Sequence, residues 1–196
     1  MRIDLDVVKG LIKPGARVLD LGCGDGSLLE ELTRTKQIQG YGLEIDPDKI
    51  TRCIAKGVNV IEQDLDTGLG HFDNKSFDAV VMSQTLQAVN YPDILLEEML
   101  RVGKECLISF PNFGHWKCRL QISLEGKMPV SNFMPYTWYN TPNIHFCTID
   151  DFEGLCRERS INILERFVLG SNNIDKHLKN INANLFAETA IYHLSK

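Results

Sequence analysis

The chain has 196 residues, a length that suits one α/β domain with a substantial buried core. Its formal net charge of −5 at pH 7 excludes the basic footprint by which proteins bind nucleic acid or an anionic membrane surface. No apolar run reaches transmembrane length and no charged-then-apolar leader opens the chain, so we expect a cytoplasmic protein that binds neither membrane nor nucleic acid.

The first predicted strand runs directly into a glycine-rich turn. Residues 18–21 are mostly apolar, as in a buried parallel strand, and the turn that follows contains Gly22, Gly24 and Gly26. Helical periodicity begins at residues 27–35, where leucines recur on one face. Glycine is required where a Cβ would block a positive-φ turn or the close approach of a ligand. We therefore expect strand, turn and helix to form one unit beneath a bound nucleoside.

Acidic residues around this turn separate two classes of ligand. Dinucleotide sites usually read Gly-x-Gly-x-x-Gly, whereas this turn reads Gly-x-Gly-x-Gly. Asp20 and Asp25 would repel a pyrophosphate but suit S-adenosyl-L-methionine, which carries an ammonium, a sulfonium and one carboxylate. We predict a site for this cofactor or its demethylated product, S-adenosyl-L-homocysteine; the alternative is a turn that only packs a helix on a sheet. Cys23 lies inside the turn, where a small side chain suffices and no nucleophilic role is expected.

The second predicted strand, residues 38–44, ends on a carboxylate. Glu44 follows Gly22 at close to the roughly 20-residue offset at which a carboxylate accepts hydrogen bonds from ribose hydroxyls. We predict that Glu44 holds the ribose, with Ile45 beside it in the same cofactor site. Asp46 and the proline after it suit the N-cap and first turn of a helix, so we expect a structural role for Asp46.

The third predicted strand, residues 58–62, leads into an acidic loop. A carboxylate there can accept a hydrogen bond from the exocyclic amine of adenine, while a neighbouring backbone N–H meets a ring nitrogen. Asp64 is the preferred candidate, with Leu65 as its neighbour, and Asp66 is the second candidate. The alternative is that these acids only solvate the loop.

Two further strands complete the predicted parallel part of the sheet, at residues 76–82 and 105–110, with a helix at 92–102 between them. Ser83 and Gln84 follow the first of these strands and are expected to face the same crevice. Five alternations of strand and helix in about 110 residues predict a doubly wound, Rossmann-like α/β sheet whose ligand lies beyond the carboxyl ends of the strands.

The chain changes character at about residues 111–147. Residues 110–146 hold eight of the sixteen aromatic residues and four of the seven prolines, which is too irregular for a long helix and too aromatic for a flexible linker. We expect an insert that closes over a ligand or forms the centre of a protein interface; side chains that only roof the core are the alternative. The aromatic candidates are Phe113, Trp116, Phe133, Tyr136, Trp138, Tyr139 and Phe146.

A helix and a strand pair are predicted to complete a single domain. Thr148 is expected to cap a helix through about residue 159, with Asp151 at the third helical position. Residues 162–169 and 186–194 suit a closing strand pair, with a short helix at 174–181 between them. The six cysteines include no C-x-x-C pair and the five histidines lack metal-ligand spacing, so we expect reduced thiols and no bound metal.

These residues resemble a known family. The segment 18–26 is similar to motif I of the class I S-adenosyl-L-methionine-dependent methyltransferases, and Glu44 and Asp64 fall where later motifs of that fold fall. The resemblance is more specific to the MetW family of methionine biosynthesis proteins and covers nearly the whole chain. The segments that carry it are 83–88, 98–103, 109–116 and 138–152.

The resemblance implies a class I methyltransferase fold, with a mostly parallel sheet closed by an antiparallel strand pair. MetW-like proteins are associated with the acylation of homoserine, as companions of a separate homoserine O-acyltransferase of the α/β-hydrolase fold. This chain contains no Gly-x-Ser-x-Gly nucleophile elbow, which fits an accessory role. We therefore expect an S-adenosyl-L-methionine-binding accessory or regulatory subunit, and self-association stays open. The alternative is a methyltransferase for an unidentified small molecule, with the methyl group near Ser83 and Gln84 and no catalytic residue assigned.

Overall fold

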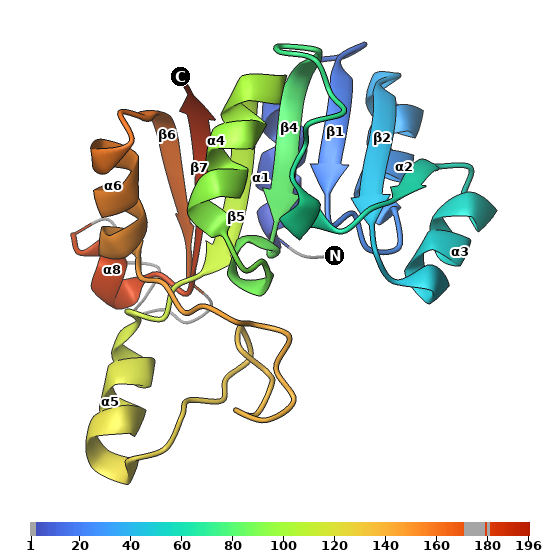
Figure 1. Ribbon diagram of the computed structural model, residues 1–196. Coiled ribbons are helices and arrows are strands. Elements are labelled where there is room, and N and C mark those ends of the chain that lie inside the picture. Colours follow the sequence, from blue (N-terminus) through green and yellow to red (C-terminus); the bar gives the residue numbers. More distant parts are fainter. Residues whose placement is uncertain (1–2, 171–178, 180) are drawn as a thin grey trace.

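The computed structural model describes residues 3–170, 179 and 181–196, and its centre is a seven-stranded sheet (Figure 1). The strands are β1 Arg17–Leu21, β2 Gln39–Glu44, β3 Asn59–Glu62, β4 Phe77–Ser83, β5 Gly103–Pro111, β6 Asn162–Leu169 and β7 Thr189–Ser195. Their order is β3-β2-β1-β4-β5-β7-β6, and neighbours are parallel except at β7, which is antiparallel to both β5 and β6. The predicted doubly wound sheet with an antiparallel closing pair is confirmed.

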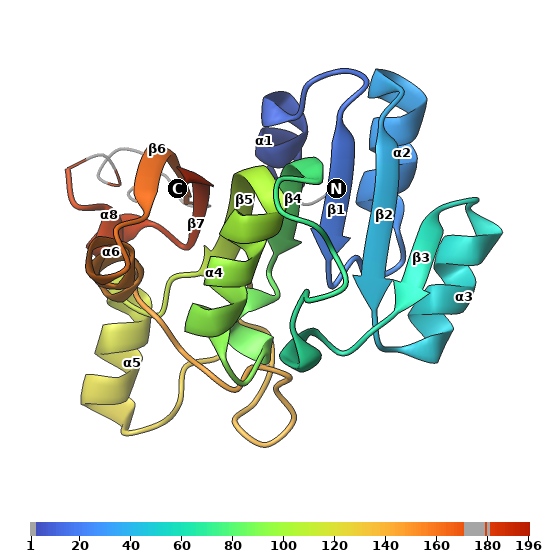
Figure 2. The same cartoon turned by 45° about the horizontal axis from the view of Figure 1, so that its top comes forward.

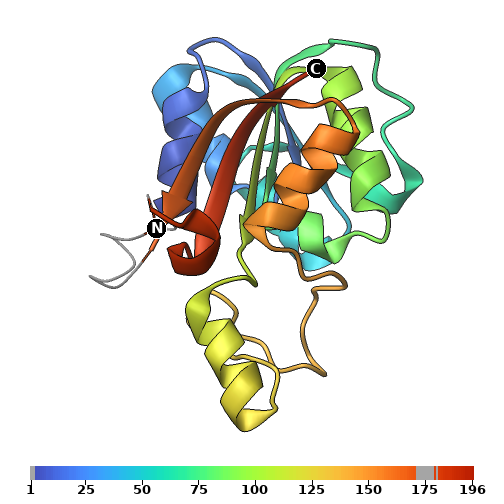
Figure 3. The same ribbon diagram turned by 90° about the vertical axis from the view of Figure 1, so that its left-hand side faces the viewer.

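Helices cover both faces of the sheet (Figure 3). The described helices are α1 Ile3–Leu11, α2 Ser27–Lys36, α3 Pro47–Ala55, α4 Pro92–Val102, α5 Trp116–Glu125, α6 Ile149–Glu158 and α8 Ala183–Phe186, with short 3₁₀ turns η1 Leu65–Thr67 and η2 Leu86–Ala88. Alternate residues of a strand point to opposite faces, so Val18 packs in a core with α1, α2 and α3, whereas Leu19 packs in a core with α4 and α6. None of the described helices is both long and apolar enough to span a membrane.

Local sequence signals set the ends of several helices. The Asp46 carboxylate accepts hydrogen bonds from the backbone N–H groups of Asp48 and Lys49, so the predicted cap of α3 is confirmed. Thr148 and Asp151 form a reciprocal capping box at the start of α6, as predicted. Helices α2 and α3 begin a few residues after β1 and β2 end, so their N-termini lie at the edge of the sheet where those strands end.

The C-terminal part of the chain differs from the prediction. The last strand was expected at 186–194 but begins at Thr189, because Ala187 N–H closes a helical turn on Ala183 O at 2.8 Å. The short helix predicted at 174–181 falls outside the described residues, apart from positions 179 and 181. The structure adds α8 at Ala183–Phe186, which the sequence did not predict.

The segment 112–147, here called the insert, lies at the carboxyl ends of the parallel strands (Figures 1 and 2). Its composition argued against a long helix, yet it contains the ten-residue helix α5. The backbone N–H groups of Ile144 and His145 donate to the Gln87 carbonyl at 2.8 and 3.0 Å, and Phe113 N–H donates to Cys147 O at 3.1 Å. These bonds fold the insert back over the sheet edge at which a ligand is expected.

Candidate functional site

Two adjoining pockets open at this edge of the sheet. The larger has a volume of about 590 Å³ and the smaller about 460 Å³, both within the usual range for small-molecule sites. Gly22, Gly24 and Ser83 line both pockets. The ends of β1 and β4 therefore lie between the two pockets.

The glycine turn lines both pockets and also packs tightly against α3. Gly24 has a φ of +60°, and a Cβ built on it would meet nothing within 4 Å, so its backbone is open to a ligand. At Gly26 a Cβ would lie 2.9 Å from Cys53 Sγ on α3. Gly26 lines neither pocket, unlike the other nine residues predicted for the cofactor, and its geometry indicates a packing role.

The Glu44 carboxylate is hydrogen-bonded to the backbone of the glycine turn and of the residues that follow β2. Its carboxylate accepts hydrogen bonds from the N–H groups of Gly24 at 2.9 Å, Ile45 at 3.0 Å and Asp46 at 3.1 Å, and the residue is only 6% exposed. Lys49 Nζ lies 3.8 Å from the same carboxylate. Because a carboxylate offers about four acceptor positions, one remains for a ligand hydroxyl. The structural contacts to the glycine turn were not predicted.

The two acidic candidates for the adenine contact have different partners. Asp64 lines the larger pocket and caps η1, where its Oδ1 accepts from Asp66 N–H at 2.9 Å. Asp66 accepts hydrogen bonds through both carboxylate oxygens, one from the backbone N–H and one from the side-chain amide of Asn90. Asp66 is therefore committed to the loop, which favours Asp64 for ligand contact.

The smaller pocket is acidic. Asp20, at the end of β1, is 3% exposed and lines it together with Cys23, Asp25 and other residues. A hydrogen bond from Lys56, at 2.6 Å, lowers the pKa of Asp25 to about 2, so this carboxylate is ionised but paired at neutral pH. Burial raises the pKa of the Cys23 thiol, which stays protonated.

Two serine hydroxyls and Asp4 form a hydrogen-bonded cluster at Ser83, which lines both pockets. Ser83 Oγ and Ser109 Oγ lie 2.9 Å apart, and both donate to Asp4 Oδ2, at 3.2 and 3.0 Å. Asp4 comes from α1, and its role could not be read from any motif because its contacts span about the first half of the chain. Ser83 itself was predicted for the cofactor site.

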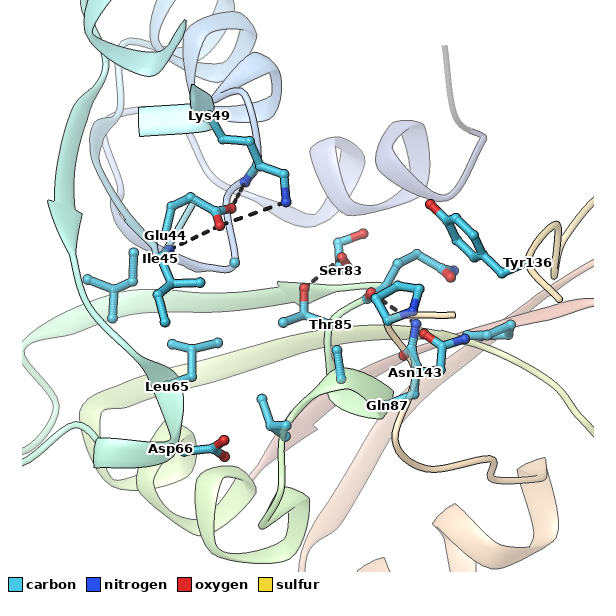
Figure 4. A pocket seen from close by; sticks show the side chains of 18 of the residues that line it. Glu44, Ile45, Lys49, Leu65, Asp66, Ser83, Thr85, Gln87, Tyr136 and Asn143 are labelled. Atoms are coloured by element: carbon cyan, nitrogen blue, oxygen red, sulfur yellow. Dashed lines mark hydrogen bonds and ion pairs between the residues drawn. The ribbon is translucent and has the colours of Figure 1, made fainter. Parts of the chain in front are cut away.

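Several further residues line the larger pocket. Figure 4 shows Glu44, Ile45 and Leu65 on one side and Tyr136 and Asn143 on the other, with Ser83 and Thr85 between them. Residues of the insert thus line the larger pocket on the side opposite the predicted cofactor residues. Lining residues that the cofactor prediction did not include are, among others, Lys49, Thr85, Gln87, Met134, Pro135 and Asn143.

The aromatic residues of the insert divide between the pocket and the surface. Phe133 and Tyr136 line the larger pocket, as one of the two expectations for the insert required. Trp138 and Tyr139 are 74% and 72% exposed and lie edge to face against each other. The insert therefore presents aromatic side chains both to a ligand cavity and to solvent.

Comparison with known proteins decides the family. The family model described as "Methionine biosynthesis protein MetW" matches residues 2–194. The chain belongs to the MetW family. A curated MetW relative from Rhodopirellula baltica, named "Bifunctional methionine biosynthesis protein MetXA/MetW", is 33% identical over 200 residues, covering 97% of this chain. That alignment covers 32% of the relative, so the chain spans about a third of its length.

Solved structures share the fold of this MetW-family chain. An S-adenosylmethionine-dependent methyltransferase from Mesorhizobium loti is 15% identical, with a TM-score of 0.72 and coverage of 97% of this chain and 96% of that chain. The magnesium protoporphyrin IX methyltransferase of Synechocystis, solved with bound SAH, is 16% identical, with a TM-score of 0.66 and coverage of 98% and 79%. At these identities the likeness establishes a methyltransferase-like fold.

Proposed function

We propose that this MetW-family protein binds S-adenosyl-L-methionine at the glycine turn and acts as an accessory or regulatory subunit of homoserine O-acyltransferase. The observation that carries the cofactor assignment is the open backbone of Gly24 beside the carboxylates of Glu44 and Asp64. The acidic lining suits a ligand with two cationic groups better than a pyrophosphate. A cytoplasmic location belongs to the same proposal and is supported by the six free cysteines.

Each part of the cofactor has a group on this chain that suits it. Asp20 would accept from the amino group, Glu44 and Ile45 would hold the ribose, and Asp64 with Leu65 N–H would contact the adenine. The backbone at Gly22, Cys23 and Gly24 would follow the ligand closely, and Ser83 would face its reactive end. When bound, S-adenosyl-L-methionine supplies an activated methyl group or serves as a regulatory ligand.

A fused relative supports the partnership with an acyltransferase. The Rhodopirellula baltica relative is named as one bifunctional MetXA/MetW protein, and joining two modules in one chain keeps them at high effective concentration. The exposed Trp138 and Tyr139 belong to residue types that are enriched at protein interfaces. The insert is therefore the surface that we assign to the acyltransferase.

A second candidate function is methyl transfer to a small molecule. It is favoured by the extent of the larger pocket, which continues past Ser83 to Tyr136 and Asn143 of the insert. Methyl transfer to a good nucleophile requires mainly proximity and in-line orientation, so a general base is not essential.

One experiment separates the two candidates. The purified protein is mixed with a homoserine O-acyltransferase, and acyl transfer to homoserine and turnover of S-adenosyl-L-methionine are both measured. We expect acyl transfer to increase and the two proteins to elute together from a sizing column. Turnover of the cofactor with no change in acyl transfer and no complex would contradict the accessory role and support the methyltransferase.

A further inference from the structure

The larger pocket has two chemically different ends. The charged side chains among its lining residues are Glu44, Lys49, Asp64 and Asp66. Figure 4 shows Glu44, Lys49 and Asp66 on the side of the predicted cofactor residues. The lining at the insert end is uncharged. It consists of polar residues such as Gln84, Gln87 and Asn143 and apolar residues such as Phe133, Met134 and Pro142.

Gln87 lines this end of the pocket, and its side-chain oxygen is a buried hydrogen-bond acceptor. The residue is only 6% exposed, and its Nε2 donates to Gln84 O at 2.9 Å, which fixes the orientation of the amide because the reverse orientation would place two oxygens together. Its Oε1 is buried and has no hydrogen-bond partner among the residues that the structure describes. A buried acceptor without a donor destabilises a protein, so a ligand N–H or O–H that displaces the side chains covering this oxygen and reaches it would be favourable.

We propose that the insert end of the pocket binds a second ligand: a small, uncharged molecule with an apolar or aromatic body and at least one N–H or O–H donor. This inference rests on the proposed function in one respect: S-adenosyl-L-methionine occupies the acidic end of the pocket. An ionised group here would lose its hydration with no opposite charge among the lining residues of this end. A free amino acid, which carries both charges, is the wrong chemical class for this subsite.

Three phenols of similar size that carry a neutral, an anionic or a cationic group test the chemical class. They are 4-hydroxybenzamide, 4-hydroxybenzoate and protonated 4-hydroxybenzylamine, which share a ring and a phenol. Binding of S-adenosyl-L-homocysteine is first measured by calorimetry, and each probe is then titrated against protein saturated with it. We expect the amide to bind about tenfold more tightly than either charged probe, because each charged group must be desolvated without a partner.

Two variants locate the subsite. Gln87→Leu removes the unused acceptor and should weaken binding of the amide about fivefold or more. Asn143→Lys adds a cation at the insert end and should reverse the preference in favour of 4-hydroxybenzoate. Asn132→Lys is the matched control, because Asn132 is exposed and does not line the pocket. All three variants should keep the wild-type affinity for S-adenosyl-L-homocysteine.

The outcomes distinguish this inference from the proposed function. If S-adenosyl-L-homocysteine does not bind the wild type, the cofactor assignment fails, and the probes are then titrated against the unliganded protein as a direct test of the subsite. If it binds but the amide does not, or a charged probe binds best, the second-ligand proposal is overturned. An Asn143→Lys variant that binds the probes like Asn132→Lys overturns their placement at the insert end.

Discussion

Glu44 combines a structural role with the proposed ligand contact. Its carboxylate joins the glycine turn after β1 to the first residues after β2 through three backbone N–H groups. A residue at a predicted ribose position is therefore also part of the framework that shapes the site. Any test of its ligand contact must separate affinity from stability.

Replacing Glu44 with Ala should reduce both quantities. We expect affinity for S-adenosyl-L-methionine to fall by about 1–3 kcal/mol through loss of charge-assisted hydrogen bonds, and the melting temperature to fall because backbone N–H groups lose their acceptor. Calorimetry and thermal unfolding measure the two effects. Glu62→Ala is the control, since Glu62 is paired in register with Glu44 at the end of β3 but is exposed and lines neither pocket. No binding to the wild type at millimolar ligand would refute the site.

The Asp25–Lys56 pair should be visible in a carboxyl titration. Lys56 lowers the pKa of Asp25 from 3.8 to about 2. Because the folded-state pKa is depressed, the stability that the pair contributes is complete above pH 3.8 and is lost as the pH falls toward 2. In Lys56→Met, NMR titration should give a pKa for Asp25 close to its ordinary value. An unchanged pKa in that variant would mean that Lys56 is not the cause.

The cysteines should be unreactive in the native protein. All six are free, and burial raises the pKa of the thiol of Cys106 to about 12 and of Cys156 to about 11. A thiol-reactive chromophore at pH 8 should therefore label the folded protein slowly and label six thiols in denaturant. A stable disulfide in freshly purified, non-oxidised protein would contradict the predicted cytoplasmic location.

Individual residues were predictable from sequence where their role depends on chain neighbours. Asp46 and Thr148 accept hydrogen bonds from backbone N–H groups two or three residues later in the chain, so local sequence identifies them as helix caps. The contacts of Asp4 with Ser83, and the burial of Gln87 beneath the insert, join segments that are far apart in the chain. Such residues have no motif of their own, and only tertiary packing reveals them.

At the scale of elements, the parallel strands were predicted closely and the insert only in outline. Apolar runs followed by glycine or acidic turns fixed β1 to β5 to within about two residues, the usual accuracy of boundary assignment. The path of the insert depends instead on backbone bonds to Gln87, which lies about 55 residues earlier in the chain. Its place over the larger pocket was expected, but helix α5 within it was not.

The insert leads to a prediction of coupling between ligand and partner. Tyr136 lines the larger pocket, while Trp138, two residues later, is exposed to solvent. We therefore expect S-adenosyl-L-methionine to change the affinity for homoserine O-acyltransferase by about 1–3 kcal/mol, and the partner to change the cofactor affinity by the same factor. Calorimetry of complex formation with and without the cofactor measures this coupling.

Trp138→Ala tests the route of that coupling. We expect the variant to bind the acyltransferase more weakly and to keep its affinity for S-adenosyl-L-methionine, since Trp138 does not line the larger pocket. Equal partner affinity in both ligand states would eliminate the regulatory role and leave a structural accessory role. Unchanged partner affinity in the variant would remove Trp138 from the interface.

At the scale of the whole molecule, the alternation of strands and helices predicted the class of sheet but not the full strand order. The site lies where the chain reverses direction across the sheet, between β1 and β4, as expected for doubly wound folds. The insertion of β7 between β5 and β6 is a long-range pairing that periodicity cannot specify. Hydrophobic alternation identifies strands, whereas their neighbours depend on the packing of the complete sheet.

Main-chain hydrogen bonds hold the insert against the rest of the protein, which leaves its side chains free to vary. Ile144 and His145 hold Gln87 through backbone N–H groups, and Phe113 holds Cys147 in the same way, so these bonds do not require particular side chains. Side chains between the anchors can change while the loop keeps its course over the pocket. A library randomised at Phe133 and Tyr136 should therefore yield many folded variants, making this segment a natural place to alter ligand choice without redesigning the sheet.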